Sequence, residues 1–284
     1  MTIHARVGAA RLQLRAAGVS PVESDLDARL LAQHVLGWTT ERFYTDANNA
    51  APDGFAPHYD TLIARRVTRE PLAYIVGHRE FWGLDLEVNP AVLIPRPSTE
   101  LIVEAILELF PLQQAALKIA DVCTGCGCVA VAIAHERPAA TLVATDISAQ
   151  ALAVARRNAE RHGVADRIAF RHGDLLEGVD GTFDAILANP PYVLDRARPA
   201  LQPEVRDHEP AVALFGGADG MTLLTRLVDE APSRLRPGGF LIVEFGLGQD
   251  VEIETLFAGT PGLALTGVRR DLQGIARTAI ATRA

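Results

Sequence analysis

Apolar residues recur at helical spacing in the first quarter of the chain. In segments 9–14 and 25–37 they return every three or four positions, which predicts two helices. We expect Ser24 to cap the second of them, because a hydroxyl there can accept a free N–H of the first turn. A third helix is expected over 59–68. The pattern therefore predicts a small helical domain over residues 1–78.

An alternating pattern replaces the helical one after this region. Residues 80–88 alternate between apolar and polar, Asn89 and Pro90 are turn residues, and 91–94 are apolar again. Alternation on either side of a turn is typical of a β-hairpin. We therefore predict a hairpin linker over residues 79–97.

From Lys118 onward, short apolar runs alternate with helical patterns. The helical segments among the first strands are 129–135 and 149–161. The runs that predict strands are 119–124, 141–146, 168–172, 185–188, 240–245, 263–268 and 278–282. Strands that alternate with helices predict a parallel sheet covered on both faces. The fold class is therefore α/β, with the sheet domain over residues 98–284.

The most informative motif is Asn189-Pro190-Pro191-Tyr192, which follows a predicted buried strand; we call it the acceptor loop. Neither proline has an N–H, so the backbone presents carbonyl acceptors. The Asn side chain adds an amide oxygen and the Tyr adds a flat aromatic face. Such a group of acceptors suits a planar substrate that carries an –NH2. Chance would produce this tetrapeptide in only about one chain of this length per thousand, which disfavours a turn that merely ends the strand.

The acceptor loop suits methyl transfer from a sulfonium to nitrogen, an in-line displacement that needs alignment and electrostatic stabilisation. The Asn189 side-chain oxygen and the Pro190 carbonyl can accept both N–H bonds of an amide, while Tyr192 packs on the planar group. We predict these three residues as catalytic, and all four loop residues, Pro191 included, as substrate-binding. A glutamine amide and the exocyclic amine of adenine fit this loop equally well.

A second motif joins the first predicted strand to its helix. This glycine loop reads Cys123-Thr124-Gly125-Cys126-Gly127. Its glycines let the backbone turn sharply and approach a ligand. Asp146 ends the second strand, where a carboxylate can accept both ribose hydroxyls, and Asp174 and Leu175 follow the third, where an acceptor and an apolar edge suit adenine. These residues, together with Asn189, predict a nucleoside-type cofactor site at the carboxyl ends of the strands.

Two other ligands match parts of the glycine loop. Its glycine spacing fits the G-x-G-x-x-G/A pattern of dinucleotide binders, but a nicotinamide enzyme leaves the acceptor loop unexplained. S-adenosylmethionine explains both motifs, with its methyl group facing Asn189. Cys123 and Cys126 have C-x-x-C spacing, but a zinc site normally needs four ligands and no second pair follows. We therefore expect S-adenosylmethionine as the cofactor and no metal.

Composition narrows the classes of partner. The 284 residues are 49% hydrophobic and 22% charged, which is enough to bury a full core. A net charge of −8 disfavours a protein that holds long nucleic acid electrostatically. No apolar stretch approaches membrane-spanning length, and the first residues lead into an amphipathic segment. We expect a cytoplasmic protein with neither a membrane nor direct nucleic acid as its partner.

These motifs resemble those of the glutamine-N5 methyltransferases that modify peptide chain release factors, the HemK/PrmC family. The resemblance covers almost the whole chain, through residues 70–77, 80–84, 93–97, 189–192, 203–210, 216–220, 237–239 and 270–272. It implies a Rossmann-like class I methyltransferase sheet with an N-terminal helical domain. It also implies that S-adenosylmethionine binds to Cys123–Gly127, Asp146, Leu175 and Asn189, and that the substrate glutamine binds to the acceptor loop.

The resemblance further implies a substrate: the glutamine in the Gly-Gly-Gln motif of release factors, which the helical domain would help to dock. A sister family methylates a glutamine of a large-subunit ribosomal protein, and the 203–210 stretch favours the release-factor branch. N6-adenine or RNA methylation is a second hypothesis, since the acceptor loop accommodates a base. A cofactor-binding module that sequesters a translation factor without turnover is a third.

Overall fold

The computed structural model describes residues 1–284, which divide into two compact units. The first, here the helical unit, comprises Met1–Gly77 and Gln202–His208. The second, the sheet unit, comprises His78–Leu201 and Glu209–Ala284. The hairpin region that we expected to act as a linker falls in the sheet unit. The chain leaves that unit after residue 201 and returns to it seven residues later, an excursion that no sequence pattern had suggested.

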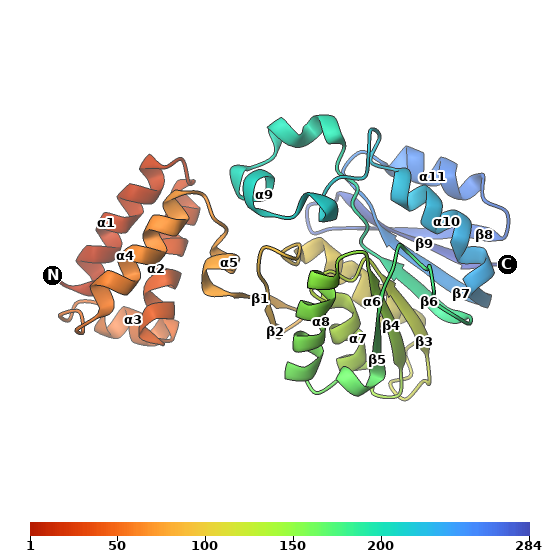
Figure 1. Ribbon diagram of the computed structural model, residues 1–284, viewed down its shortest axis with the longest axis horizontal. Coiled ribbons are helices and arrows are strands. Elements are labelled where there is room, and N and C mark those ends of the chain that lie inside the picture. Colours follow the sequence, from red (N-terminus) through yellow and green to blue (C-terminus); the bar gives the residue numbers. More distant parts are fainter. The chain divides into compact units, whose positions relative to one another are not determined.

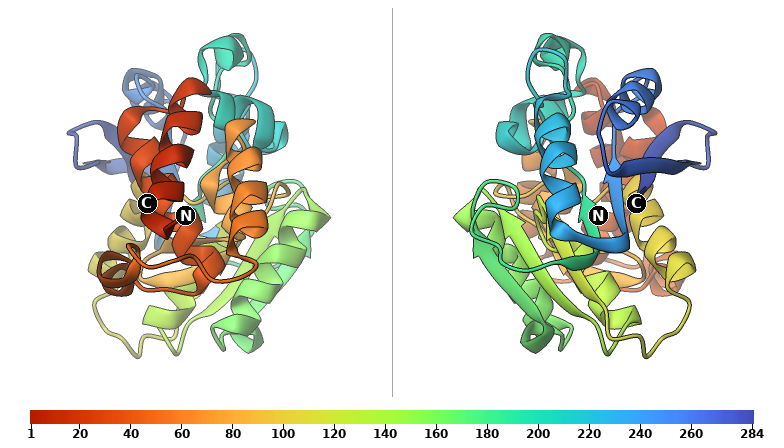
Figure 2. Two further views of the ribbon diagram at one scale, coloured as in Figure 1. Left: turned by 90° about the vertical axis from the view of Figure 1, so that its left-hand side faces the viewer. Right: turned by 90° about the vertical axis from the view of Figure 1, so that its right-hand side faces the viewer.

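The helical unit is built on a core of apolar side chains from its longer helices. Figure 2 shows α1, α2 and α4 packed side by side, and their buried residues include Ile3, Leu14, Leu31, Tyr59 and Ile63. The helical spacing was informative here because each helix has one apolar face. The helices of this unit are α1 (Ile3–Ala16), α2 (Pro21–Leu36), α3 (Thr40–Asp46), α4 (Phe55–Val67), α5 (Leu72–Val76) and the later α9 (Pro203–His208).

The predicted cap of the second helix at Ser24 is wrong. Helix α2 begins at Pro21, and Ser20 caps it by accepting a hydrogen bond from the Glu23 N–H at 3.2 Å. A proline at the first helical position is favourable, since that N–H has no partner within the helix. Ser24 lies one turn further on, is buried, and donates its hydroxyl to the Val19 carbonyl at 3.2 Å.

A partly buried ion cluster holds α9 in the helical unit. Arg66 is only 3% exposed; it donates to Asp27 at 2.7 Å and to Glu204 of α9 at 2.9 Å. Arg69 donates to both oxygens of Glu204, each at 2.7 Å. Burial raises the pKa of Glu204, but the hydrogen bonds from Arg69 and Arg66 outweigh it and bring the pKa down to about 2. Glu204 is therefore ionised at neutral pH and paired on both sides.

Replacing Glu204 by alanine should lower the free energy of unfolding by about 3 kcal/mol, because the variant leaves the buried Arg66 charge with one partner fewer. Since the folded-state pKa of Glu204 lies below its ordinary value of 4.5, its contribution is complete above pH 4.5 and is lost as the pH falls through about 2. Urea denaturation of the full chain at pH 7 measures the loss. Asp46→Ala, in an exposed pair with Arg42, is the control and should change stability by less than about 0.5 kcal/mol. Equal effects of the two variants would contradict the role of the cluster.

The sheet unit begins with a β-hairpin, as expected, and a turn forms at Asn89-Pro90, but the prediction that this turn connects the hairpin strands is wrong. Strands β1 (His78–Phe81) and β2 (Leu84–Glu87) pair antiparallel, and the turn is Trp82-Gly83. Both turn residues have positive φ, +55° and +71°, as a type I′ hairpin requires. Residues 91–94 form no strand.

The main sheet has seven strands in the order β5-β4-β3-β6-β7-β9-β8. The pairs from β5 to β7 are parallel, whereas β9 is antiparallel to both β7 and β8. This confirms the α/β fold class. The strand order reverses between β3 and β6, the type of point at which open α/β sheets bind ligands. The strands are β3 (Lys118–Val122), β4 (Thr141–Asp146), β5 (Ile168–His172), β6 (Phe183–Ala188), β7 (Leu235–Glu244), β8 (Leu263–Arg270) and β9 (Ala276–Arg283).

Helices cover both faces of this sheet (Figure 1). One face carries α6 (Glu100–Leu109), α7 (Cys128–Glu136) and α8 (Ala149–Arg161), and the other carries α10 (Thr222–Arg234) and α11 (Asp250–Ala258). The central strands are buried on both sides, which explains their continuous apolar runs. None of the helices combines the length and the apolar character that crossing a membrane requires. Short 3-10 helices lie at Pro97–Thr99, Ala165–Arg167, Asp195–Ala200 and Ala211–Ala213.

Candidate active site

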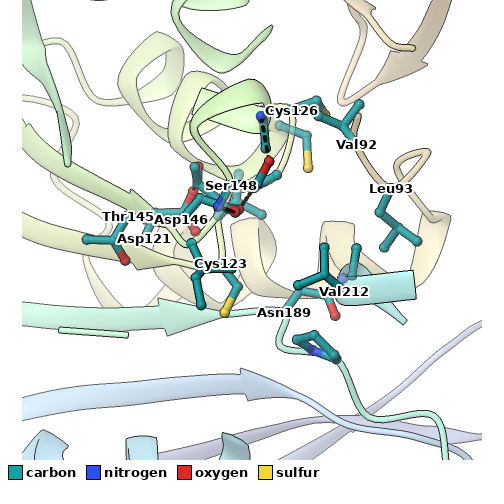
Figure 3. Close-up of a pocket in the computed structure, with 18 of the residues that line it drawn as sticks. Val92, Leu93, Asp121, Cys123, Cys126, Thr145, Asp146, Ser148, Asn189 and Val212 are labelled. Carbon is teal, nitrogen blue, oxygen red and sulfur yellow. Dashed lines mark hydrogen bonds between the residues drawn. The ribbon is translucent and has the colours of Figure 1, made fainter. Parts of the chain in front are cut away.

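A cavity opens at the carboxyl ends of β3, β4 and β6, entirely within the sheet unit (Figure 3). Segments 91–93 and 95–96 line it beside several residues predicted from the sequence. The predicted residues in its wall are Cys123, Thr124, Gly125, Cys126, Asp146, Asp174, Leu175, Asn189 and Pro191. Gly127, Pro190 and Tyr192 do not line it. The two motifs, 62 residues apart from Gly127 to Asn189 in the sequence, thus meet at one cavity.

Asp146 holds the glycine loop in place. One of its carboxylate oxygens accepts the Gly125 N–H at 2.9 Å and the other accepts the Ser148 N–H at 2.8 Å. Each oxygen keeps lone-pair capacity for a further donor from the cavity. Burial raises the pKa of Asp146, while these two backbone hydrogen bonds oppose the shift. The arrangement suits a carboxylate that accepts a pair of neighbouring hydroxyl groups.

Asp121, at the end of β3, is an acidic residue of the cavity that the sequence analysis did not select. It is 2% exposed and accepts the Thr124 hydroxyl at 2.6 Å. Burial raises the pKa of Asp121 to about 7. The hydrogen bond from the Thr124 hydroxyl to Asp121 fixes the first turn of the glycine loop.

Gly127 lies behind the glycine loop, against helix α8. A Cβ atom at this position would approach the Ala155 Cβ to 3.0 Å and its Cα to 3.2 Å. The absence of a side chain therefore lets α8 pack closely on the loop. Asn158, fully buried on the same helix, donates to the Cys126 carbonyl at 2.9 Å and to the Glu87 carbonyl at 3.0 Å. Helix α8 thus ties the loop to the hairpin.

The two cysteines of the glycine loop, and Cys128 at the start of α7, act as small packing residues. Cys126 and Cys128 are buried, Cys123 is half-buried, and all three are free thiols. Burial raises the pKa of the Cys123 thiol, and a hydrogen bond with Cys126 raises that of Cys128, so both stay protonated at neutral pH. No group of three His, Cys, Asp or Glu side chains is arranged to hold a metal ion.

The residues after β5 give the cavity an edge that is partly polar and partly apolar. Leu175 is 3% exposed, with φ of +51°. Asp174 accepts a hydrogen bond from Arg226 at 2.9 Å, so part of its acceptor capacity is already used. Both line the cavity, as a pocket for a flat heterocycle beside an apolar side chain would require.

The acceptor loop begins at Asn189, which faces the cavity (Figure 3). Its side-chain Nδ2 donates to the Thr99 hydroxyl at 3.0 Å. The Tyr192 hydroxyl donates to Glu244 at 3.0 Å, and its buried surroundings raise the pKa of the tyrosine. Thr99 and Glu244 were not among the predicted site residues, since neither carries a recognisable motif.

The glycine-rich stretch 216–220 has a steric explanation at this loop. A Cβ atom at Gly216 would overlap the Pro191 carbonyl oxygen, and one at Gly220 would overlap that of Tyr192. The Gly216 N–H donates to the Val193 carbonyl at 2.9 Å. The backbone of the acceptor loop therefore packs directly on the backbone of this stretch, which only glycine permits.

Comparison with protein families matches two parts of the chain. Residues 97–203 match the methyltransferase small domain, and residues 8–77 match the PrmC N-terminal domain. The first match spans the glycine loop and the acceptor loop. The second covers most of the helical unit.

Curated proteins match the chain over nearly its full length. A release factor glutamine methyltransferase of Bradyrhizobium diazoefficiens is 40% identical over 284 residues, which cover 99% of this chain and 93% of that protein. One from Moorella thermoacetica is 39% identical, covering 100% of this chain and 99% of the relative. One from Geobacter sulfurreducens is 46% identical over 76% of this chain and 74% of its own length.

Solved structures share the fold. A ribosomal protein methylase from Lactobacillus delbrueckii subsp. bulgaricus superimposes with a TM-score of 0.51 at 24% identity, covering 69% of this chain and 83% of that one. A T. thermophilus 16S rRNA methyltransferase, solved with AdoMet and guanosine, gives 0.52 at 19% identity, covering 73% and 50%. At these identities the likeness establishes the methyltransferase fold alone.

Proposed function

Because the chain belongs to the family of release factor glutamine methyltransferases and is an S-adenosylmethionine-dependent protein glutamine methyltransferase, we propose that it methylates N5 of the glutamine in the Gly-Gly-Gln motif of peptide chain release factors. One observation supports this most strongly. The acceptor loop and the Asp146-anchored glycine loop line the same cavity. An amide held at Asn189 then faces a methyl donor held by the glycine loop.

The residues of the cavity fit S-adenosylmethionine, which supplies an electrophilic methyl group when bound. Asp146 has lone-pair capacity on both oxygens and is the acceptor for the two ribose hydroxyls. Gly125 and Cys126 bring backbone close to the nucleoside, and Leu175 with Asp174 forms the edge for the adenine. The half-buried Cys123 lines the same wall and adds apolar contact.

In this proposal the acceptor loop orients the substrate nitrogen. The Asn189 side-chain oxygen and the Pro190 carbonyl each accept one N–H of the glutamine amide, which aligns the nitrogen and stabilises the positive charge it develops. Pro191 lines the cavity next to Asn189, whereas Pro190 does not, so the role of the Pro190 carbonyl stays a prediction. Packing of the Tyr192 ring on the amide stays a prediction, because Tyr192 is held by Glu244 outside the cavity wall.

The test is methyl transfer from labelled S-adenosylmethionine to three substrates offered separately: a bacterial release factor, the large-subunit ribosomal protein and duplex DNA. Peptide mass mapping locates the label. We expect it on the Gly-Gly-Gln glutamine. Label on the ribosomal protein alone would assign the sister substrate, and label on DNA alone would mean that the acceptor loop holds a base.

Gly216→Ala should lower kcat for release-factor methylation by about 10-fold or more, because the new Cβ overlaps the Pro191 carbonyl oxygen and displaces the acceptor loop. The cofactor Kd should change by less than about threefold, since the glycine loop is untouched. Steady-state kinetics and calorimetry measure the two quantities. Gly267→Ala, where a Cβ meets no atom within 4 Å, is the control. A variant with unaltered kcat would show that the contact does not position the loop.

Cofactor affinity should weaken as the pH falls, because protonation turns an acceptor oxygen of Asp146 into a donor. Burial raises the pKa of Asp146 above its ordinary value of 3.8, so the loss should start at a higher pH than for an exposed aspartate. Calorimetric Kd values between about pH 8 and pH 4 test this. Asp121, whose pKa is about 7, titrates within this interval, and Asp121→Asn removes its contribution. A Kd that is still unchanged in that variant at about pH 4, where an exposed aspartate begins to protonate, would contradict the role of Asp146.

A further inference from the structure

The hydroxyl of Thr99 lies between Asn189 and Glu244, and its single proton determines which of the two hydrogen bonds it donates and which it accepts. Thr99 is 2% exposed and Glu244 is fully buried. The Thr99 hydroxyl donates to Glu244 Oε2 at 2.7 Å. Because the only hydroxyl proton of Thr99 is used in this bond, the Thr99 oxygen can only accept a hydrogen bond from Asn189. The donor is Nδ2 of Asn189, at 3.0 Å.

Glu244 is the anchor of this arrangement because it is surrounded by hydroxyl donors. Its Oε1 accepts from the Ser98 hydroxyl at 3.2 Å and from the Tyr192 hydroxyl at 3.0 Å, while Oε2 accepts from Thr99. Burial raises the pKa of Glu244, while the hydrogen bonds from these three hydroxyl groups oppose the shift. As a carboxylate Glu244 is acceptor-only, so all three hydroxyl protons point towards it. None of these groups lies on the glycine loop, and all belong to the sheet unit.

We propose that Thr99 and Glu244 are positioning residues that fix the side-chain amide of Asn189 in one of its two possible orientations. Nδ2 is held towards Thr99, and Oδ1 is left to accept an N–H of the substrate. This rests on the proposed function, in which Oδ1 performs that task. The reversed amide would turn its own N–H groups towards those of the substrate, leaving buried donors without acceptors.

Thr99→Val tests the inference with nearly the same side-chain shape and no hydroxyl. It should lower kcat by about 10- to 100-fold, whereas KM for the protein substrate and the Kd for S-adenosylmethionine change by less than about threefold. Thr99→Ser restores the hydroxyl and should recover most of the lost turnover. If Thr99→Ser is as impaired as Thr99→Val, or if Thr99→Val turns over like wild type, the inference is wrong.

Glu244→Gln tests the direction of the hydrogen bonds that run from Asn189 through Thr99 to Glu244. Its amide can donate to Thr99, which frees the Thr99 proton for Oδ1 of Asn189 and reverses the amide. The single variant should lose about 10-fold or more in kcat. In the double variant with Thr99→Val, the further loss relative to Thr99→Val alone should be less than about threefold, because both changes act through one hydroxyl. Fully multiplicative losses would show that Glu244 acts elsewhere. Tyr192→Phe, which removes only the Tyr192 hydroxyl bond to Glu244, measures the contribution of Tyr192 separately.

The wild-type result of the three-substrate assay separates the two claims. Turnover on the release factor tests the proposed function. The second claim is that Thr99 and Glu244 orient the Asn189 amide. It is tested by the ratio of the kcat of Thr99→Val to that of Thr99→Ser, measured on whichever substrate the wild type methylates. Methylation of a substrate other than the release factor therefore overturns the proposed function. The claim about Thr99 and Glu244 can still be tested, and contradicted, by the Thr99 variants on that substrate.

Discussion

Asn189→Ala is expected to lower kcat for release-factor methylation by about 30- to 900-fold, equivalent to about 2–4 kcal/mol of transition-state stabilisation. An amide nitrogen is a poor nucleophile because its lone pair is delocalised into the carbonyl. The Asn189 oxygen accepts one N–H more strongly as positive charge develops on the nitrogen, so the loss should fall on kcat more than on KM. Single-turnover kinetics with labelled cofactor isolate the methyl-transfer step.

The controls for this variant distinguish chemistry from folding. Asn48→Ala, at an exposed position of the helical unit, should leave kcat unchanged within about twofold. The cofactor Kd of Asn189→Ala should move far less than its kcat, because Asp146 and the glycine loop carry most of that binding. Turnover of Asn189→Ala within a few-fold of wild type would contradict our account of the acceptor loop.

Asp146→Ala is expected to raise the Kd for S-adenosylmethionine about 100-fold, close to 3 kcal/mol. The variant loses the acceptor for both ribose hydroxyls and also releases the Gly125 and Ser148 N–H groups that the carboxylate now holds. The glycine loop then loses both its anchor and its ligand contact. Isothermal titration calorimetry measures the change directly.

The matched control for this prediction is Asp180→Ala, an aspartate exposed on the same unit. It should bind the cofactor with a Kd within about twofold of wild type. If Asp146→Ala bound the cofactor equally well, the ribose would have to lie elsewhere in the cavity. The pH dependence predicted for the Kd would then have no basis in Asp146.

The sheet could be predicted closely from sequence because buried parallel strands are short apolar runs between helical patterns. The structure has β4, α8 and β5 at the predicted residues 141–146, 149–161 and 168–172. The hairpin turn was misplaced because Trp82 adopts positive φ, an uncommon conformation for a bulky residue. Nothing in the alternation of apolar residues reports backbone conformation, whereas Asn89-Pro90 has the usual composition of a turn.

The grouping of 202–208 with the helical unit could not be predicted for a different reason. It depends on Glu204 meeting Arg66, which is 138 positions away in the sequence. Charged residues of this kind usually lie in solvent. Only the tertiary structure shows that Arg66 is buried and that Glu204 pairs with it.

The site was predicted in part, and the division follows from geometry. Asp146 ends one parallel strand and Asn189 follows another. Parallel strands bring such residues to one edge of the sheet, so their proximity was expected. Thr99 and Glu244 act through burial and through the direction of one hydroxyl proton. Neither property is visible in the sequence. The steric need for Gly216 likewise appears only once the Pro191 carbonyl is in place.

The most direct test of the central claim is a crystal structure of the chain with S-adenosylhomocysteine and a peptide that contains Gly-Gly-Gln. We predict the glutamine amide nitrogen within hydrogen-bonding distance of both the Asn189 side-chain oxygen and the Pro190 carbonyl, with the ribose hydroxyls on Asp146. A glutamine side chain bound away from the acceptor loop, or a nucleoside bound away from Asp146, would contradict the account.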